Sequence, residues 1–236
     1  MNKDFQIVVP FYNDYKNFLK FIEIINQLET DKKIFILLDN GSSNGEMLNY
    51  QNKNLSDNQC WKVVRSENNL GFGGGIKFCS QYVDSEFIGW MPGNMKLDPL
   101  DVFSLFNETK SQDKDFLLKA YRSGRPFLDY IKTLIFGLIA TLYTRYNMFD
   151  AGGTPSLTRK KLFNKLDNLP DDFTFDIFVL YFFRFNNLKV IRPKIKYTTR
   201  MHGKSHWQDG LLTELNFAFS IFSSLNRLKK ENRFYE

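Results

Sequence analysis

Short apolar runs alternate with helix-like patterns through the first half of the chain. The apolar runs predict strands over residues 5–12, 33–39, 61–66, 87–91 and 116–121, and the patterns between them predict helices near 15–28, 73–84 and 98–109. Such alternation is typical of a doubly wound sheet with helices on its two faces. The sequence therefore predicts a Rossmann-like α/β fold with a mixed, mainly parallel sheet.

The second half of the chain carries two amphipathic patterns. A helix is predicted near 127–146, where apolar residues recur at spacings of three and four, at Leu128, Ile131, Ile135, Leu138 and Leu142. Another is predicted near 211–230, and it ends in basic residues, Arg227, Lys229, Lys230 and Arg233. Those residues fit the end of a helix dipole and an anionic membrane surface equally well. The longest uncharged apolar run, 133–144, is shorter than the ~20 residues of a spanning helix, so we expect neither helix to cross a membrane.

The chain of 236 residues contains no linker or charge-block shift that would divide it. We therefore expect one domain over 1–208, followed over 209–236 by an amphipathic basic helix packed on that domain or on a membrane. The net charge of +6 calls for an anionic partner: nucleic acid, acidic lipid or a phosphorylated substrate. Nucleic acid is the weakest of these, because there is no zinc-binding pattern and no helix-turn-helix signal. Two cysteines without a framework, and a start without a signal-peptide core, favour the cytoplasm.

Polar or glycine-rich residues follow every predicted strand. In sheets of this type ligands bind at the carboxyl ends of the strands. After the first strand, Pro10, Tyr12 and Asn13 form a polar turn suited to a nucleotide pocket. Asp39 ends the second strand, where its carboxylate is placed to bind a ligand or, alternatively, to close an Asx turn with the Asn-Gly pair that follows.

Two further segments carry the chemistry of a phosphate site. Asn69-Leu-Gly71-Phe-Gly-Gly74 follows the third strand, and it departs from the dinucleotide fingerprint because Ile76 stands where G-x-G-x-x-G needs glycine. Arg200-Met-His-Gly-Lys204 gathers two cations and backbone amides around a glycine, as a bound phosphate requires. Both segments indicate a phosphorylated ligand.

The strand ends and these two segments resemble family 2 glycosyltransferases of the GT-A fold, in the branch similar to dolichol-phosphate mannosyltransferase and bacterial polyprenyl-phosphate glycosyltransferases. The resemblance covers residues 5–207 and implies that Asp39 contacts the base or ribose of a nucleotide sugar. The residues assigned to donor binding are Pro10, Tyr12, Asn13, Asp39, Asn40, Asn69, Gly71, Gly74, Asn94 and Arg122. A clamp for phosphate would draw on cations at Arg122, Arg125, Arg159, Arg200 and Lys204.

The segment after the fourth strand departs from the family. Relatives carry Asp-x-Asp-x-Gln here, whose acids hold Mg²⁺ or Mn²⁺ on the diphosphate. This chain has Pro92, Asn94 and Lys96 at the three positions. Three outcomes stay open: metal-independent transfer with Lys96 neutralising the leaving diphosphate, weak metal binding through Asn94 and Asp98, or loss of catalysis.

The residues 150–159 and 171–176 resemble the acceptor half of the family. Asp172 and Asp176 are one helical turn apart and are expected to share a helix face. For a hydroxyl acceptor one of them would act as general base. A lipid phosphate is already ionised and needs only positioning and charge stabilisation. Either Asp is equally well explained as a helix cap or a solvated acid.

These observations predict an enzyme that moves a sugar, with inversion, from a nucleotide diphosphate to a membrane-linked acceptor such as polyprenyl phosphate in envelope glycan synthesis. Its catalytic residues would be Lys96, Asp172, Asp176, Arg200 and Lys204. It would lie in the cytoplasm against the anionic inner face of the cell membrane. The alternatives are transfer to a sugar hydroxyl in polysaccharide assembly and a catalytically silent nucleotide-sugar-binding protein.

Overall fold

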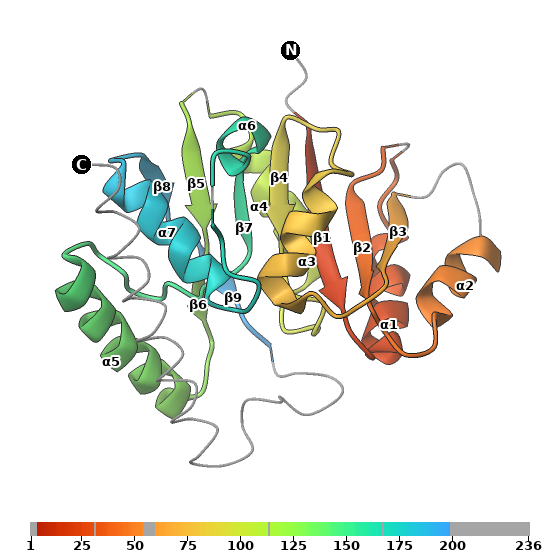
Figure 1. The fold of residues 1–236 in the computed structure, drawn as a ribbon, viewed down its shortest axis with the longest axis horizontal. Helices are drawn as coiled ribbons and strands as arrows, with labels where there is room; N and C mark the ends of the chain where they lie inside the picture. Colours follow the sequence, from red (N-terminus) through yellow and green to blue (C-terminus); the bar gives the residue numbers. More distant parts are fainter. Residues whose placement is uncertain (1–3, 31, 54–59, 113, 167, 199–236) are drawn as a thin grey trace.

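The computed structural model describes residues 4–30, 32–53, 60–112, 114–166 and 168–198. Within them a seven-stranded sheet has the strand order β3-β2-β1-β4-β7-β5-β8 (Figure 1). Its strands are β1 (Phe5–Phe11), β2 (Phe35–Asn40), β3 (Trp61–Ser66), β4 (Phe87–Trp90), β5 (Phe116–Lys119), β7 (Ser156–Arg159) and β8 (Lys189–Ile191). β7 runs antiparallel to β4 and β5, and the other neighbours pair in parallel. The predicted mixed, mainly parallel sheet is confirmed.

Helices cover both faces of this sheet, as Figure 1 shows. One face packs against α1 (Tyr15–Ile25) and α4 (Pro99–Thr109), and the other packs against α3 (Gly71–Ser80), α6 (Lys160–Phe163) and α7 (Phe175–Phe185). Along β1, Ile7 and Val9 belong to the first core and Val8 to the second. Because both faces are buried, the central strands read as continuous apolar runs.

Two elements differ from the sequence expectation. The helix α2 (Glu46–Lys53) was not predicted, because it is polar and buries only Met47. The strand expected over 116–121 is divided: β5 ends at Lys119, and β6 (Tyr121–Ser123) pairs in parallel with β9 (Lys194–Lys196) as a separate two-stranded sheet. This second sheet carries the chain away from the main sheet, below its carboxyl edge in Figure 1.

The amphipathic helix α5 (Phe127–Thr144) is longer than its uncharged core. Its 18 residues meet the length and composition of a membrane span, so the expectation that it is too short, which rested on 133–144 alone, is wrong on length. Only 11% of it is buried inside the molecule. One narrow side packs inward, since a Cβ on Gly137 would lie 3.1 Å from the Cα atom of Phe149.

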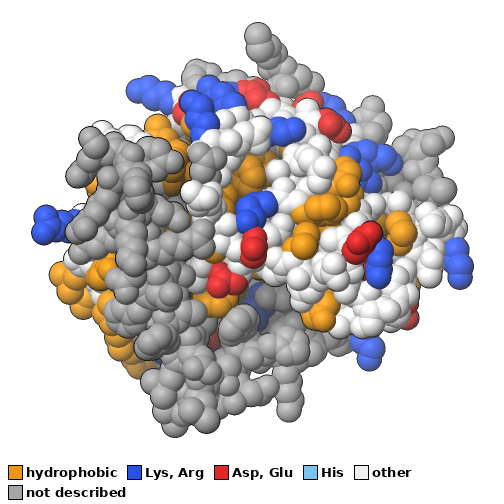
Figure 2. All heavy atoms as spheres, in the orientation of Figure 1, with side chains coloured by type: hydrophobic (Ala, Val, Ile, Leu, Met, Phe, Trp, Pro, Cys, Tyr) orange, Lys and Arg blue, Asp and Glu red, His pale blue; other side chains and the backbone are white. Residues whose placement is uncertain are grey.

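The opposite side of α5 faces outward and is apolar. Phe127, Leu128 and Leu142 are each more than 70% exposed and Leu138 is 61% exposed. In Figure 2 this side is an apolar patch at the lower left edge. Many of the other phenylalanines are buried in the core, which explains much of the high Phe content.

Candidate active site

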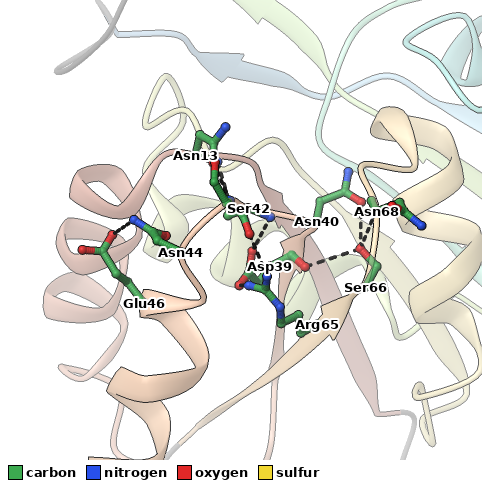
Figure 3. A network of polar contacts seen from close by, with 10 residues as sticks. Asn13, Asp39, Asn40, Ser42, Asn44, Glu46, Arg65, Ser66 and Asn68 are labelled. Carbon is green, nitrogen blue, oxygen red and sulfur yellow. Dashed lines mark hydrogen bonds and ion pairs between the residues drawn. The ribbon is translucent and has the colours of Figure 1, made fainter.

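The turns after β1 and β2 are tied together at the carboxyl edge of the sheet (Figure 3). The Asn13 N–H donates to the Ser42 hydroxyl oxygen at 3.0 Å, and the Ser43 N–H donates to the Asn13 side-chain oxygen at 3.0 Å. Asn13 has φ +48°, in the left-handed region that Asn tolerates better than most residues. Tyr12 beside it is 46% exposed and Pro10 is half-buried within β1. The predicted polar turn is therefore present at the rim.

Asp39 lies beneath this rim and is fully buried. Its Oδ1 atom accepts a hydrogen bond of 3.0 Å from the Ser42 N–H, and its Oδ2 atom pairs with the Arg65 guanidinium. Arg65 also donates to the Ser42 carbonyl oxygen at 2.7 Å. Figure 3 shows both partners converging on the carboxylate. Asp39 thus closes its turn at the N–H three residues on, rather than two as in an Asx turn, and the implied contact with a nucleotide base stays a prediction.

The side chains of Asn40 and Asn69 shape the start of α3. The Asn40 side chain accepts from the Leu70 N–H at 3.1 Å and donates to the Gly71 carbonyl at 2.9 Å. The Asn69 side chain accepts from the Gly71 N–H at 2.9 Å. The side-chain amides of Asn40 and Asn69 thus hold the loop before α3 in place by bonding to its backbone. The sequence pattern alone did not indicate this role.

The glycines of this loop approach a protein backbone. Gly71 has φ +72°, and a Cβ there would lie 2.4 Å from the Asp171 carbonyl oxygen. The Gly74 N–H donates to the same oxygen at 2.9 Å. These glycines therefore allow a close approach to the segment before α7, and their assignment to donor binding stays a prediction. A cleft of about 460 Å³ lies where these segments meet, lined by Asn69, Leu70, Gly71, Gly74, Asp171 and Asp172.

The turn after β4 does not offer the oxygen ligands of a divalent cation. The Asn94 side-chain oxygen accepts from the Lys96 N–H at 3.2 Å, and an Asp98 carboxylate oxygen caps α4 at the Leu100 N–H at 2.8 Å. Among the described residues, no three His, Cys, Asp or Glu side chains gather as a metal site. Asn94 and Asp98, the two candidate ligands, are thus engaged in local structure, and with Pro92 and Asn94 in place of two carboxylates this turn does not fit a divalent cation held by an acidic pair.

Asp172 and Asp176 do not share a helix face, so that expectation is wrong. α7 begins at Phe175, and Asp172 lies in the turn before it, where its carboxylate accepts from the Thr174 N–H at 2.8 Å. Asp172 lines the cleft. Asp176, in the first turn of α7, is buried away from it. The two acids would share a face only if both were in the helix, but α7 begins three residues after Asp172.

Asp176 forms a buried ion pair with Lys119, the last residue of β5. The Lys119 ammonium donates to the Asp176 carboxylate at 2.6 Å, and the Trp90 indole N–H donates to the same oxygen at 3.1 Å. The Lys119 side chain is 0% exposed, and burial lowers its pKa against the opposing charge of Asp176. Lys119 was not predicted as a site residue, although a lysine at the end of an apolar strand indicates a buried charge that needs a partner.

Arg122 binds Asp150 in the turn before β7. Its Nε–H donates to the Asp150 carboxylate at 2.8 Å, its backbone N–H donates at 3.0 Å, and its guanidinium lies over the Tyr197 ring. Burial alone would raise the pKa of Asp150, but the charge and hydrogen bonds of Arg122, together with Arg192, hold it below its usual value. Arg122 is thus placed by a carboxylate rather than left free.

Cations outnumber acids around this pair. The pKa of Arg192 is lowered by burial and by the nearby charges of Arg184 and Arg122, and the pKa of Arg125 is lowered by burial and by Arg122. The interacting groups are the cations Lys119, Arg122, Arg125, Arg184 and Arg192 and the acids Asp129, Asp150 and Asp176. Lys119, Asp150 and Asp176 are buried and the other five groups are half-buried. Such a surplus of cations over acids among the described residues is suited to an anion. We call these eight residues the basic cluster.

Other predicted clamp residues fall elsewhere. Arg159 pairs with Glu86 and Asp115 at the amino end of β4, on the opposite edge of the sheet, so its place in the clamp is wrong. Arg200 and Lys204, the helix near 211–230 and the boundary at residue 208 lie outside the described residues. The structure does describe Thr198, whose N–H donates to the Lys96 carbonyl at 2.9 Å.

A mixed, mainly parallel sheet with polar turns at its carboxyl edge, a glycine-rich helix start and a basic cluster fits a transferase of the GT-A type. The family model for glycosyl transferase family 2 matches residues 6–167, and the chain belongs to that family. It is therefore a glycosyltransferase. No curated protein matches its sequence.

Solved structures of glucosyl-3-phosphoglycerate synthase from Mycobacterium tuberculosis share the fold. The complex with Mn²⁺, UDP and glucosyl-3-phosphoglycerate has a TM-score of 0.70 at 15% identity, over 95% of this chain and 79% of that one. The complex with Mn²⁺, UDP-glucose and phosphoglyceric acid has the same score and identity, over 95% and 80%. The complex with Mg²⁺ and UDP has a TM-score of 0.67 at 15% identity, over 90% and 76%.

Proposed function

We propose that this glycosyltransferase transfers a sugar, with inversion, from a nucleotide-diphosphate sugar to polyprenyl phosphate at the inner surface of the cell membrane. The observation that carries the proposal is the position of the basic cluster beside α5. Arg125 donates to the Thr133 hydroxyl within α5 at 2.6 Å, so the cluster and the helix are joined. A phosphate group on an apolar chain matches both surfaces at once.

The membrane part of the proposal rests on the outward side of α5. A helix with one side packed on the protein and the other side apolar and exposed lies in the interface of a bilayer rather than across it. Lys132 within α5 and Arg145 just after it would meet anionic headgroups. Each basic residue near such a surface contributes about 1 kcal/mol to membrane binding. This placement would bring a lipid phosphate to the basic cluster.

The chemistry needs little from a base. The acceptor phosphate is ionised at neutral pH, so its oxygen attacks the anomeric carbon without first losing a proton, and positioning and charge stabilisation suffice. Arg122 and Arg125 would orient that phosphate. The engagement of Asp176 by Lys119 supports this reading, because that carboxylate is not placed to accept a proton from an acceptor. Arg200 and Lys204 would bind the donor or acceptor phosphate.

One observation favours a second candidate, transfer to a sugar hydroxyl. Asp172 lines the cleft beside α3, and a carboxylate there would act as general base for a neutral acceptor. The two candidates differ in their acceptor and in their dependence on Asp172. Asp172→Asn should abolish transfer to a hydroxyl and leave transfer to a lipid phosphate largely intact.

The experiment offers nucleotide sugars with UDP and GDP leaving groups to the purified full chain, with decaprenyl phosphate in anionic vesicles or with soluble glycans as acceptor. Sugar on the lipid, detected by mass spectrometry, is the expected result. Arg200→Ala and Lys204→Ala should each lower turnover at least tenfold, consistent with a charge-assisted bond of ~1.5–3 kcal/mol. If product forms only with glycans, a sugar hydroxyl is the acceptor in place of the lipid phosphate. If no product forms although the nucleotide sugar still binds, a catalytically silent nucleotide-sugar-binding protein is favoured.

Vesicle cosedimentation tests the membrane surface separately. Binding to vesicles of 30% phosphatidylserine should fall with rising salt and should be weaker for phosphatidylcholine alone. Leu138→Gln with Leu142→Gln should weaken binding at least tenfold, since each buried leucine contributes ~1.5–3 kcal/mol. Tyr82→Gln, at an exposed position remote from α5, is the control. Equal recovery with and without vesicles at low salt would remove the membrane from the proposal.

A further inference from the structure

Several oxygen atoms of the turn after β4 accept hydrogen bonds from the protein. Beyond the side chains of Asn94 and Asp98, the carbonyl of Lys96 accepts from the Thr198 N–H at 2.9 Å. The Thr198 hydroxyl lies 3.4 Å from the carbonyl oxygens of Met95 and Lys96. A divalent cation needs several unoccupied oxygen ligands, and charged ones above all. This turn offers few of them.

The path of the turn is also fixed by packing. A Cβ on Gly93 would lie 2.4 Å from a ring atom of Phe11, so the backbone there is held against the end of β1. Met95 has φ +56° and is buried, which fixes the turn between Asn94 and Lys96. Shifting the backbone to create a metal site would break these contacts. The backbone at Lys96 is therefore held by its neighbours, and the Lys96 side chain is half-buried.

We propose that this turn neutralises the leaving nucleoside diphosphate with the Lys96 ammonium group and holds no divalent cation. The inference rests on the proposed transfer from a nucleotide-diphosphate sugar and adds how the leaving group is stabilised. In the transfer, a bond forms between the acceptor oxygen and the anomeric carbon, and the bond between that carbon and the diphosphate oxygen breaks. The diphosphate leaves with the electron pair and gains one negative charge, which Lys96 offsets while keeping its proton.

Ligand binding tests this without reference to turnover. The affinities of UDP, GDP and uridine are measured by isothermal titration calorimetry for the full chain, with 5 mM EDTA or with 1 mM MnCl₂. The nucleoside diphosphate that binds should do so with the same Kd under both conditions. Lys96→Gln should weaken its binding at least tenfold and leave uridine binding unchanged. Lys114→Gln, an exposed lysine just before β5 at the opposite edge of the sheet, is the matched control.

A gain-of-metal variant makes the test reciprocal. Pro92→Asp, Asn94→Asp and Lys96→Gln together restore the acidic pattern of the family. In this variant Mn²⁺ should tighten nucleoside diphosphate binding at least tenfold, with electron paramagnetic resonance of Mn²⁺ showing a bound ion that the wild-type chain lacks. Thermal unfolding confirms that each variant is folded. If the triple variant is folded and still ignores Mn²⁺, the assignment of this turn to the diphosphate is overturned.

Further results would also overturn the proposal. Wild-type diphosphate binding that is lost in EDTA and restored by Mn²⁺ would show a metal site. Unchanged diphosphate affinity in folded Lys96→Gln would remove the lysine from the leaving group. If the wild-type chain binds neither UDP nor GDP, both the inference and the proposed nucleotide-sugar donor are overturned. Metal-dependent sugar transfer would overturn the inference and leave the proposed function intact.

Discussion

The buried pair of Lys119 and Asp176 gives a stability prediction that follows from its burial. Lys119→Met keeps most of the side-chain volume and leaves the Asp176 carboxylate, 3% exposed, without its cation. Removing one partner of a buried ion pair costs about 3–5 kcal/mol. Two hydrogen bonds to Asp176 remain, from Trp90 at 3.1 Å and Ser156 at 3.5 Å, so the lower half of that range is expected.

The assay is urea unfolding followed by tryptophan fluorescence, supported by thermal unfolding. A loss of about 3 kcal/mol corresponds to roughly 6–12 °C in Tm for a chain of this size.

Two further variants isolate the cause. Asp176→Asn added to Lys119→Met removes the isolated charge, and the amide can still accept from Trp90, so stability should recover by at least ~1.5 kcal/mol. Lys194→Met, at an exposed position on β9, should change stability by no more than about 0.5 kcal/mol. A Lys119→Met protein within 1 kcal/mol of wild type at pH 7, or a double variant less stable than the single one, would refute the reasoning.

Two other predictions concern the same edge of the sheet. The pKa of Asp150 is lowered in the folded state, so its contribution to stability is complete above its unfolded pKa of about 3.9 and is lost as the pH falls through the lower folded-state pKa. Asp150→Asn should cost about 3 kcal/mol at pH 7, and this loss, measured by urea unfolding, should shrink as the pH falls through that folded-state pKa; a pH-independent loss would contradict this. Gly71→Ala should destabilise by at least ~2 kcal/mol, because positive φ strain adds to a clash with the Asp171 carbonyl. Gly45→Ala is its control, since Gly45 has φ +59° but its Cβ would meet nothing closer than 3.5 Å; equal losses in the two variants would refute the clash.

Much of the fold could be predicted from the sequence because its signals are local. The central strands are buried on both faces and read as apolar runs, and the turn residues after them read as polar. α2 was not predicted because it buries only Met47 and therefore shows no periodic pattern of apolar residues. The polar residues at the carboxyl edge, Tyr12, Asn13 and Asp39, were predicted for the same local reason: each stands at or beside a strand end.

The basic cluster was beyond such reasoning. Lys119 ends β5, Arg122 lies on β6 and Arg192 lies between β8 and β9. They meet only because β5 ends, β6 departs from the sheet and β9 returns beside it. Asp150 binds Arg122 across 28 positions of sequence. No spacing rule encodes such a meeting, because it depends on how strands far apart in the chain pair.

The sequence by itself determined the α/β class, the polar carboxyl edge and the loss of the acidic pair after β4, since each follows from residue types at neighbouring positions. Only the tertiary structure decided which charged groups are partnered. It buried Asp176 against Lys119, sent Arg159 to the opposite edge and turned the apolar side of α5 outward. The physical reason is that the energy of a charge or an apolar side chain depends on what surrounds it, and the surroundings are supplied by residues distant in the chain.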